Sequence, residues 1–130
     1  MYTILACIDE DPNRAVRQAE TIASLPSAQE DISVILVHVF KDNPKGASVS
    51  RVQSVRRAAS LLDDAGIANE IIEESGNPAE EIIKEASDPA VDAVCVATKK
   101  RSPVGKAVFG SVAQNVLLGV EQPVIVVSDE

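Results

Sequence analysis

The order of apolar runs and helical segments is the feature of this chain that most limits how it can fold. Short runs rich in Val, Ile and Leu alternate with segments of helical periodicity. The runs that predict strands are Tyr2 to Ile8, Ser33 to Phe40, Ala68 to Glu73, Ala93 to Ala97 and Val124 to Ser128. Four of them show little polar alternation, as parallel strands covered on both faces do. The run Ala68 to Glu73 is more polar, which predicts the edge of a sheet.

Four helices are predicted between these strands, and most begin or end at a clear signal. Asp11 supplies an N-cap before Pro12 at the first helical position. Gly66 closes the second helix, and Asn77-Pro78 opens the third. The helices are expected from 12 to about 23, from 50 to 65, from 78 to the Asp88-Pro89 step, and from 111 to 118.

The resulting β-α-β order places the chain in the α/β class. It implies a five-stranded parallel sheet with right-handed crossovers and helices on both faces, in a single domain over residues 1–130. In such sheets ligands bind outside the carboxyl ends of the strands, where the winding direction reverses. The places to search for chemistry therefore follow Ile8, Phe40 and Ala97.

Charge and composition limit the partners of this chain. It has 12 basic and 20 acidic residues, a net charge of -8, and an aromatic fraction of 2%. Nucleic-acid binding usually relies on basic surfaces and stacking aromatic residues, so we expect no nucleic-acid partner. No apolar run approaches the roughly 18 residues of a membrane span, and the N-terminus lacks the basic region of a signal peptide. We therefore expect a cytoplasmic protein without a membrane partner.

One segment reverses the overall charge. Residues 93–120 contain no Asp or Glu, and they carry +4 while the rest of the chain carries -12; the basic residues are Lys99, Lys100, Arg101 and Lys106. Gly110-Ser111 stands at the start of the predicted fourth helix, where free N–H groups and the helix dipole favour a phosphate. The segment is therefore a candidate anion site. In the alternative interpretation, Ser111 only caps the helix and the cations only balance the acidic surface.

The remaining candidate residues have both a functional and a structural interpretation. Asp9 can accept a hydrogen bond from a ribose hydroxyl or a base N–H. In the alternative interpretation, its side chain only stabilises the structure of its own loop. His38 is the only histidine, and we expect it to be packed and hydrogen-bonded. Cys7 and Cys95 lack the CxxC spacing of metal or redox sites and are predicted to be buried thiols. No catalytic triad or His–carboxylate cluster is evident, so we expect no catalytic residues and no metal site.

At these residues the chain resembles the universal stress protein family over essentially its whole length. The motifs that carry the resemblance are Ile8-Asp9, Val37-His38-Val39, Gly76-Asn77-Pro78, Phe109-Gly110-Ser111-Val112-Ala113 and Gln122-Pro123-Val124-Ile125-Val126-Val127. The resemblance implies a three-layer α/β/α sandwich with strand order 3-2-1-4-5, similar to the adenine nucleotide alpha hydrolases. It also implies a homodimer that binds ATP or AMP, with Mg2+ only beside ATP, and that acts in the stress response.

ATP-binding members of that family carry the motif Gly-x2-Gly-x9-Gly-[Ser/Thr]. Gly110 and Ser111 match its end, but Ala97 and Lys100 stand at its first two glycines. This is a departure, because glycine there lets the backbone approach phosphates without a Cβ in the way. Lys100 and its neighbours can instead neutralise phosphates by side chain. The resemblance thus implies a nucleotide site made of Asp9, Val39, Ala97, Lys100, Arg101, Gly110 and Ser111.

Two functions from different classes follow. The first is a nucleotide-binding, stress-response regulatory protein; slow ATP hydrolysis or self-phosphorylation stays open, but turnover is not its expected function. The second is a dimeric stress-protection or interaction protein with a degenerate nucleotide site, as Ala97 and Lys100 indicate. In both, the strand Val124 to Ser128 is expected to pair with its copy across a twofold axis. A terminal strand that is apolar on both faces is an open template for pairing.

Overall fold

The computed structural model describes residues 1–40, 52–98 and 110–128. Apart from the short helix α2, its strands and helices follow one another as the sequence predicts. The strands are β1 (Tyr2–Cys7), β2 (Ile32–Phe40), β3 (Ala68–Ser75), β4 (Ala93–Thr98) and β5 (Val124–Ser128). The helices are α1 (Pro12–Ala23), α2 (Ala28–Asp31), α3 (Gln53–Asp64), α4 (Pro78–Ala86) and α5 (Ser111–Gly119).

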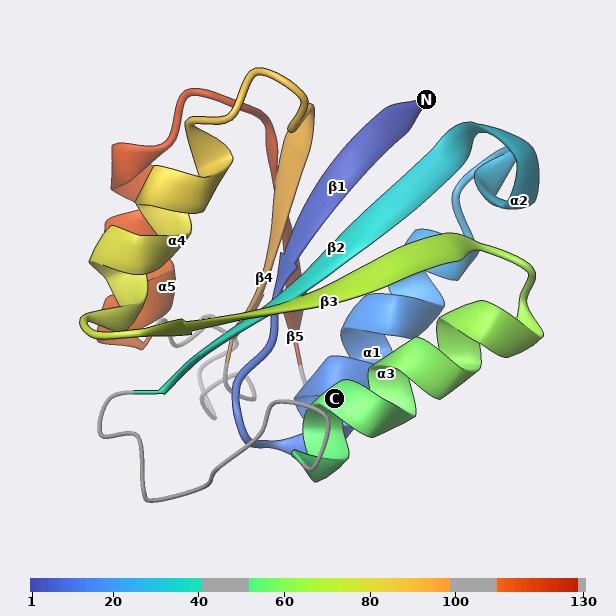
Figure 1. Ribbon diagram of the computed structural model, residues 1–130, viewed down its shortest axis with the longest axis horizontal. Helices are drawn as coiled ribbons and strands as arrows, with labels where there is room; N and C mark the ends of the chain where they lie inside the picture. Colours follow the sequence, from blue (N-terminus) through green and yellow to red (C-terminus); the bar gives the residue numbers. More distant parts are fainter. Residues whose placement is uncertain (41–51, 99–109, 129–130) are drawn as a thin grey trace, which may run out of the picture.

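The strands form one five-stranded parallel sheet in the order β3-β2-β1-β4-β5. Helices α1 and α3 cover one face of this sheet, and α4 and α5 cover the other (Figure 1). The three-layer sandwich, its strand order and the edge position of β3 are therefore confirmed. The chain continues from the central β1 to β2 on one side and later reaches β4 on the other. The winding direction thus reverses between β1 and β4.

The core lies in two apolar layers, one on each face of the sheet. Successive side chains of a strand point to opposite faces, so alternate residues of β1 enter different layers. On the side of α1 and α3, Ile4 belongs to a cluster with Ile22 and Leu62. On the side of α4 and α5, Leu5 belongs to a cluster with Ile82. The central strands are largely buried on both faces, which is why their sequences are mostly apolar.

Differences from the predicted boundaries have local causes. α3 begins at Gln53, because Val52 is extended with φ -72° and ψ 118°; residues 50 and 51 of the predicted helix lie outside the described ranges. β3 continues to Ser75, which pairs with Phe40. The four residues of α2 make only one turn, which is too short for periodicity to predict. No helix in the described ranges is long and apolar enough to cross a membrane.

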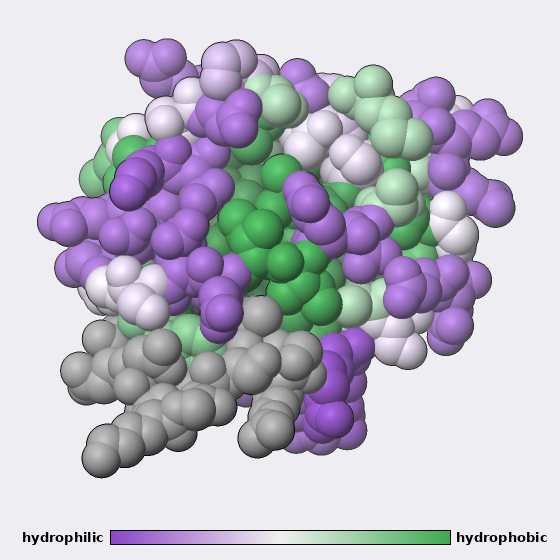
Figure 2. All heavy atoms as spheres, viewed as in Figure 1, coloured by the Kyte–Doolittle hydropathy of each residue, from purple (hydrophilic) through white to green (hydrophobic). Residues whose placement is uncertain are grey.

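The two edges of the sheet differ in polarity. β3 faces the viewer in Figure 1, and Figure 2 shows apolar atoms in the middle of this face with hydrophilic ones around them. At the β3 edge, Glu70 and Glu73 are exposed and place charged side chains among the apolar ones. At the other edge, β5 carries no charged residue, and Val126 is 41% exposed. Charged side chains on an edge strand oppose pairing, so β3 is protected from pairing and β5 is not.

Candidate functional site

The carboxyl ends of β1, β2 and β4 lie at one edge of the sheet, in the lower part of Figure 1. α5 begins at the same edge, because it has to run back to the start of β5. The predicted site residues found there are Asp9, Val39, Ala97, Gly110 and Ser111. Lys100 and Arg101 lie outside the described residues. The fold thus brings five predicted positions to the edge where the winding direction reverses.

The carboxylate of Asp9 is held in one orientation. Its Oδ1 accepts a hydrogen bond from the backbone N–H of Asp11, and its Oδ2 accepts one from Nε of Arg14, both at 2.8 Å. Asp11 in turn caps α1 by accepting from the N–H groups of Asn13 and Arg14. The Asp9 side chain is still 48% exposed. Each of its oxygens therefore keeps a lone pair for a ligand hydroxyl.

Two buried side chains hold the loop that carries Asp9. His38 donates through Nδ1–H to the carbonyl of Ile8 at 2.7 Å, because a carbonyl oxygen can only accept. Its ring packs edge-on against Phe40, with centroids 4.8 Å apart. Ser54, in the first turn of α3, donates to the carbonyl of Asp9 at 2.5 Å. The prediction that His38 is packed and hydrogen-bonded is confirmed, and Ser54 is a supporting residue that was not identified from the sequence.

The N-terminus of α5 is the part of this edge best suited to an anion. No side chain of the described residues caps it, whereas Asp11 caps α1 and Asn77 caps α4. Gly110 precedes the helix with φ -71° and ψ 162°, a conformation that any residue adopts. A Cβ built at Gly110 would meet no atom of the described residues within 4 Å. The described residues thus leave space beside Gly110 before the first turn of α5, and the N-terminus of a helix is a favourable place for an anion.

The sheet opens between β1 and β4 at the same edge. Pairing of these strands ends at Ala6 and Cys95, whereas β1 stays paired with β2 for a further residue. The amide of Gln18, from α1, lies at the start of this gap. Its Nε2 donates to the carbonyls of Cys7 at 3.0 Å and of Cys95 at 3.2 Å. Gln18 was not identified from the sequence, although a polar residue on the buried face of α1 was the available signal.

Both thiols are poorly reactive. Cys95 is buried, as predicted, whereas Cys7 at the end of β1 is only partly buried, and both are free. Burial raises the pKa of Cys95 to about 12, and the hydrogen bond from Gln18 only partly opposes the shift. Burial and then the charge of Cys95 raise the pKa of Cys7 as well. The thiols stay protonated at neutral pH. Within the described ranges, no group of three or more His, Cys, Asp or Glu side chains could hold a metal ion.

A carboxyl pair lies near the carboxyl end of β2. Glu74 of β3 is the register partner of Val39, and its side chain shares a hydrogen bond with Glu85 of α4. This hydrogen bond, partial burial and the charge of Glu74 raise the pKa of Glu85 to about 7. The charge of Lys84 lowers this pKa and that of Asp88 raises it. Glu85 therefore holds its proton to a higher pH than an ordinary surface carboxyl does.

The Glu85→Gln substitution is expected to stabilise the protein above pH 7 and to leave it unchanged in acid. The folded protein holds the proton of Glu85 up to about pH 7, and the unfolded chain holds it only up to the ordinary pKa of 4.5. The stability linked to this proton is complete below pH 4.5 and is lost as the pH rises through 7. Urea unfolding of variant and wild type at about pH 4, 6 and 8 measures the difference. A difference that does not grow with pH would contradict the shared proton.

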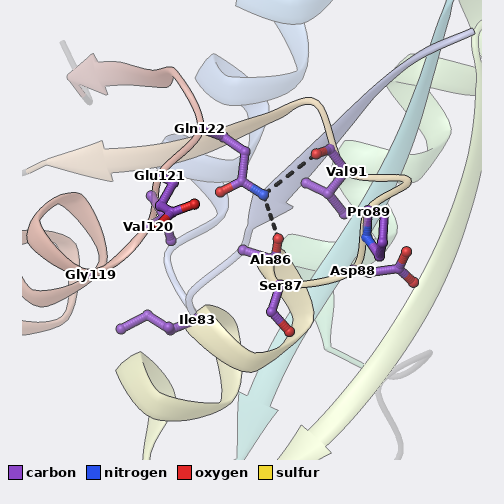
Figure 3. Close-up of a pocket in the computed structure, with 10 residues that line it drawn as sticks. All are labelled: Ile83, Ala86, Ser87, Asp88, Pro89, Val91, Gly119, Val120, Glu121 and Gln122. Atoms are coloured by element: carbon purple, nitrogen blue, oxygen red, sulfur yellow. Dashed lines mark hydrogen bonds between the residues drawn. The ribbon is translucent and has the colours of Figure 1, made fainter.

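A hollow of about 560 Å³ lies at the opposite edge of the sheet (Figure 3). The end of α4 and the segment between α5 and β5 line it, and both precede strands rather than follow them. Gln122 extends across it, and its Nε2 donates to the carbonyls of Ala86 and Val91 (Figure 3). None of the predicted nucleotide-binding residues within the described ranges lines this hollow. Gln122 therefore serves the structure by tying the end of α4 to the start of β5.

Comparisons with known proteins agree with this architecture. The model of the universal stress protein family matches residues 1–128. A universal stress protein from Archaeoglobus fulgidus is 25% identical, with 98% of each chain covered and a TM-score of 0.77. The structure of the universal stress protein from Archaeoglobus fulgidus in complex with dAMP is 20% identical, with 98% of each chain covered and a TM-score of 0.72. A universal stress protein family protein from Arabidopsis thaliana with AMP bound is 15% identical, covering 98% of this chain and 92% of that one, with a TM-score of 0.72.

The family assignment rests on the sequence model together with the fold. The comparison with curated protein sequences finds no match. The model match spans nearly the whole chain, including Ile8-Asp9, Gly76-Asn77-Pro78 and Gly110-Ser111, the positions at which the resemblance was seen. The strand order agrees with that resemblance. This chain belongs to the universal stress protein family.

Proposed function

We propose that this protein is a stress-response regulator that works as a homodimer and binds an adenine nucleotide, AMP or ATP, at the carboxyl ends of β1, β2 and β4. The observation that carries the proposal is the N-terminus of α5. No side chain of the described residues caps it, no described atom lies within 4 Å of a Cβ built at Gly110, and Ser111 is exposed. Such a terminus stabilises a phosphate through its N–H groups and its dipole. Membership of the universal stress protein family supports the role in stress.

The ribose and the base have partners along the same edge. Asp9 offers a fixed, half-exposed carboxylate to the ribose hydroxyls. The carbonyl of Val37 accepts from Ile8 of β1, and the carbonyl of Phe40 accepts from the opposite side of β2. Because backbone groups alternate along a strand, those of Val39 point to the side of β1, where β1 has already ended. They are therefore available to the edge of an adenine ring.

The phosphates have two sources of positive charge. The first turn of α5 meets one phosphate through its N–H groups and through the hydroxyl of Ser111. Lys100 and Arg101 are proposed to neutralise the phosphates by side chain, in place of the glycines of the family motif. Mg2+ would enter only with the longer phosphate chain of ATP.

Three complexes of similar proteins support this ligand class. Their structures are described as complexes with dAMP, with cAMP and with AMP. Each of these ligands combines adenine with a single phosphate group, and one helix N-terminus is matched to a single phosphate. AMP is therefore the first ligand to test on this chain, and ATP the second.

A dimeric protein with a degenerate site is the second candidate function. Ala97 and Lys100 favour it, since they stand where the ATP-binding motif of the family has glycine. Ala97 lies within β4, in register with Val127. A methyl group at this position narrows the approach of a ligand to the backbone of β4.

The nucleotide content of the protein as purified tests the proposal. The protein is denatured, and the released fraction is separated by chromatography and read at 260 nm. The chain has no Trp and one Tyr, so bound adenine stands out against its weak absorbance near 280 nm. Near-stoichiometric AMP or ATP, or uptake of added AMP in equilibrium dialysis, is the expected result. A protein that is empty and also ignores added AMP and ATP would favour the degenerate-site candidate.

A further inference from the structure

We propose that Gln18 is a positioning residue of the nucleotide site, which keeps β1 and β4 apart and holds an ordered O–H donor in the gap between them. This inference rests on the proposed nucleotide binding. Gln18 belongs to α1 and is 1% exposed, so its amide lies in the core behind the carboxyl edge of the sheet. Any group that it binds is therefore held away from bulk water.

The chemistry of its two partners fixes the orientation of the Gln18 amide. The carbonyls of Cys7 and Cys95 are acceptors, and only the NH2 group of the amide can donate to them. Both N–H bonds are used in this way, so Oε1 is the atom that remains. Oε1 is buried and has no hydrogen-bond partner among the described residues. A buried acceptor without a donor is unfavourable, which points to a donor other than the described residues.

The position of this acceptor connects it with the ligand. The gap lies where β1 separates from β4. This is the kind of position at which open α/β sheets bind their ligands. Gln18 holds the carbonyl of Cys7, and Asp9 follows two residues later, so the amide also sets the path of the chain toward Asp9. In the part of the chain that the structure describes, the one other buried side-chain polar atom without a partner is Oγ1 of Thr98, at the end of β4. Both polar atoms without a partner therefore lie at β4, because Gln18 contacts this strand and Thr98 is part of it.

An ordered water or a ribose hydroxyl can supply the donor, and the two share the same chemistry. Each presents a small O–H group, which suits an acceptor as deeply buried as Gln18 Oε1. In the nucleotide-bound protein, Gln18 then connects β1, β4 and the ligand or its water. Gln18 acts through these groups and not on the phosphate itself.

Binding of AMP to two variants of α1 tests this role. Gln18→Met keeps the length of the side chain and removes its hydrogen bonds, and we expect it to weaken AMP binding at least about tenfold. Ile22→Val is the matched control, because it removes one methylene from a fully buried residue one turn further along the same face. It is expected to change AMP affinity by less than about twofold. Equilibrium dialysis gives the affinities, and thermal unfolding shows that both variants fold.

Deoxynucleotides identify the donor. If a ribose hydroxyl donates to Gln18, the tenfold penalty of Gln18→Met disappears for whichever of 2′-deoxy-AMP and 3′-deoxy-AMP lacks that hydroxyl. A penalty that persists with both analogues assigns the donor to an ordered water. If Ile22→Val lost as much AMP affinity as Gln18→Met, the loss would be explained by the general stability of the core. That result would overturn the inference.

The failure of this inference is distinguishable from the failure of the proposed function. Wild type and Gln18→Met that bind AMP equally well would overturn the role of Gln18 and leave nucleotide binding intact. Wild type that binds neither AMP nor ATP would overturn the proposed function. A high-resolution crystal structure would show whether an O–H donor lies beside Gln18. An oxygen atom within hydrogen-bond distance of Gln18 Oε1 supports the ordered donor, and the absence of such an atom overturns this part of the inference.

Discussion

The Ser111→Glu substitution is expected to weaken AMP binding by about 100-fold or more, while the protein stays folded. Ser111 is exposed at the first position of α5, and no side chain of the described residues caps this helix. A carboxylate there interacts favourably with the helix dipole, by about 0.3–1 kcal/mol. The same carboxylate stands where we place the phosphate and repels it. Stability and affinity are thus expected to move in opposite directions, which a general loss of structure cannot imitate.

Gln114→Glu provides the matched control for this prediction. Gln114 is also exposed on α5, one turn further on, so the substitution adds the same charge to the same helix. We expect at most about a threefold loss of AMP affinity, because this exposed charge interacts with the phosphate through water of high dielectric constant and does not stand in the place of the phosphate. Calorimetric titration with AMP and thermal unfolding measure both quantities. Unchanged AMP binding in Ser111→Glu would place the phosphate away from α5.

The elements of the fold could be predicted because their signals are local. The caps at Asp11-Pro12 and Asn77-Pro78 start α1 and α4 as the sequence indicates. The strand order has no such local signal, because it depends on pairing between segments that are distant in the sequence. It was inferred from the family resemblance. The start of α3 escaped prediction because helical spacing continues before Gln53, while the backbone at Val52 is extended. Periodicity describes which face is apolar, and it does not fix where a helix ends.

The candidate site could be predicted only where a residue stands at the end of a strand or at the start of a helix. Asp9 and Gly110 were identified as candidates in this way, because the topology of a parallel sheet fixes where such positions lie. The contacts that support them are not local. Gln18 reaches Cys95 across 77 positions of sequence, and Ser54 reaches Asp9 across 45. A polar residue on an apolar helix face signals that a buried partner exists, but it does not identify the partner.

The Val126→Asp substitution is expected to turn a homodimer into a monomer. β5 forms one edge of the sheet, and Val126 is 41% exposed there with no charged residue in the strand. The opposite edge, β3, carries exposed Glu70 and Glu73. We propose that two β5 strands meet across a twofold axis, which would cover Val126 and satisfy the open backbone groups of both edges. A carboxylate at Val126 would then be buried against its own copy, and an unpaired buried charge is strongly unfavourable.

Val126→Thr separates charge from shape in this test, because it keeps the β-branched form and remains neutral. We expect it to stay dimeric in light scattering, while Val126→Asp is monomeric. The net charge of -8 per chain makes two copies repel each other, so added salt should tighten the wild-type dimer. Salt should not rescue Val126→Asp even at about 1 M, because the unfavourable term there is loss of hydration rather than long-range repulsion. A dimer that survives Val126→Asp would move the interface away from β5, and Leu118 on α5, 76% exposed, would be the next position to change.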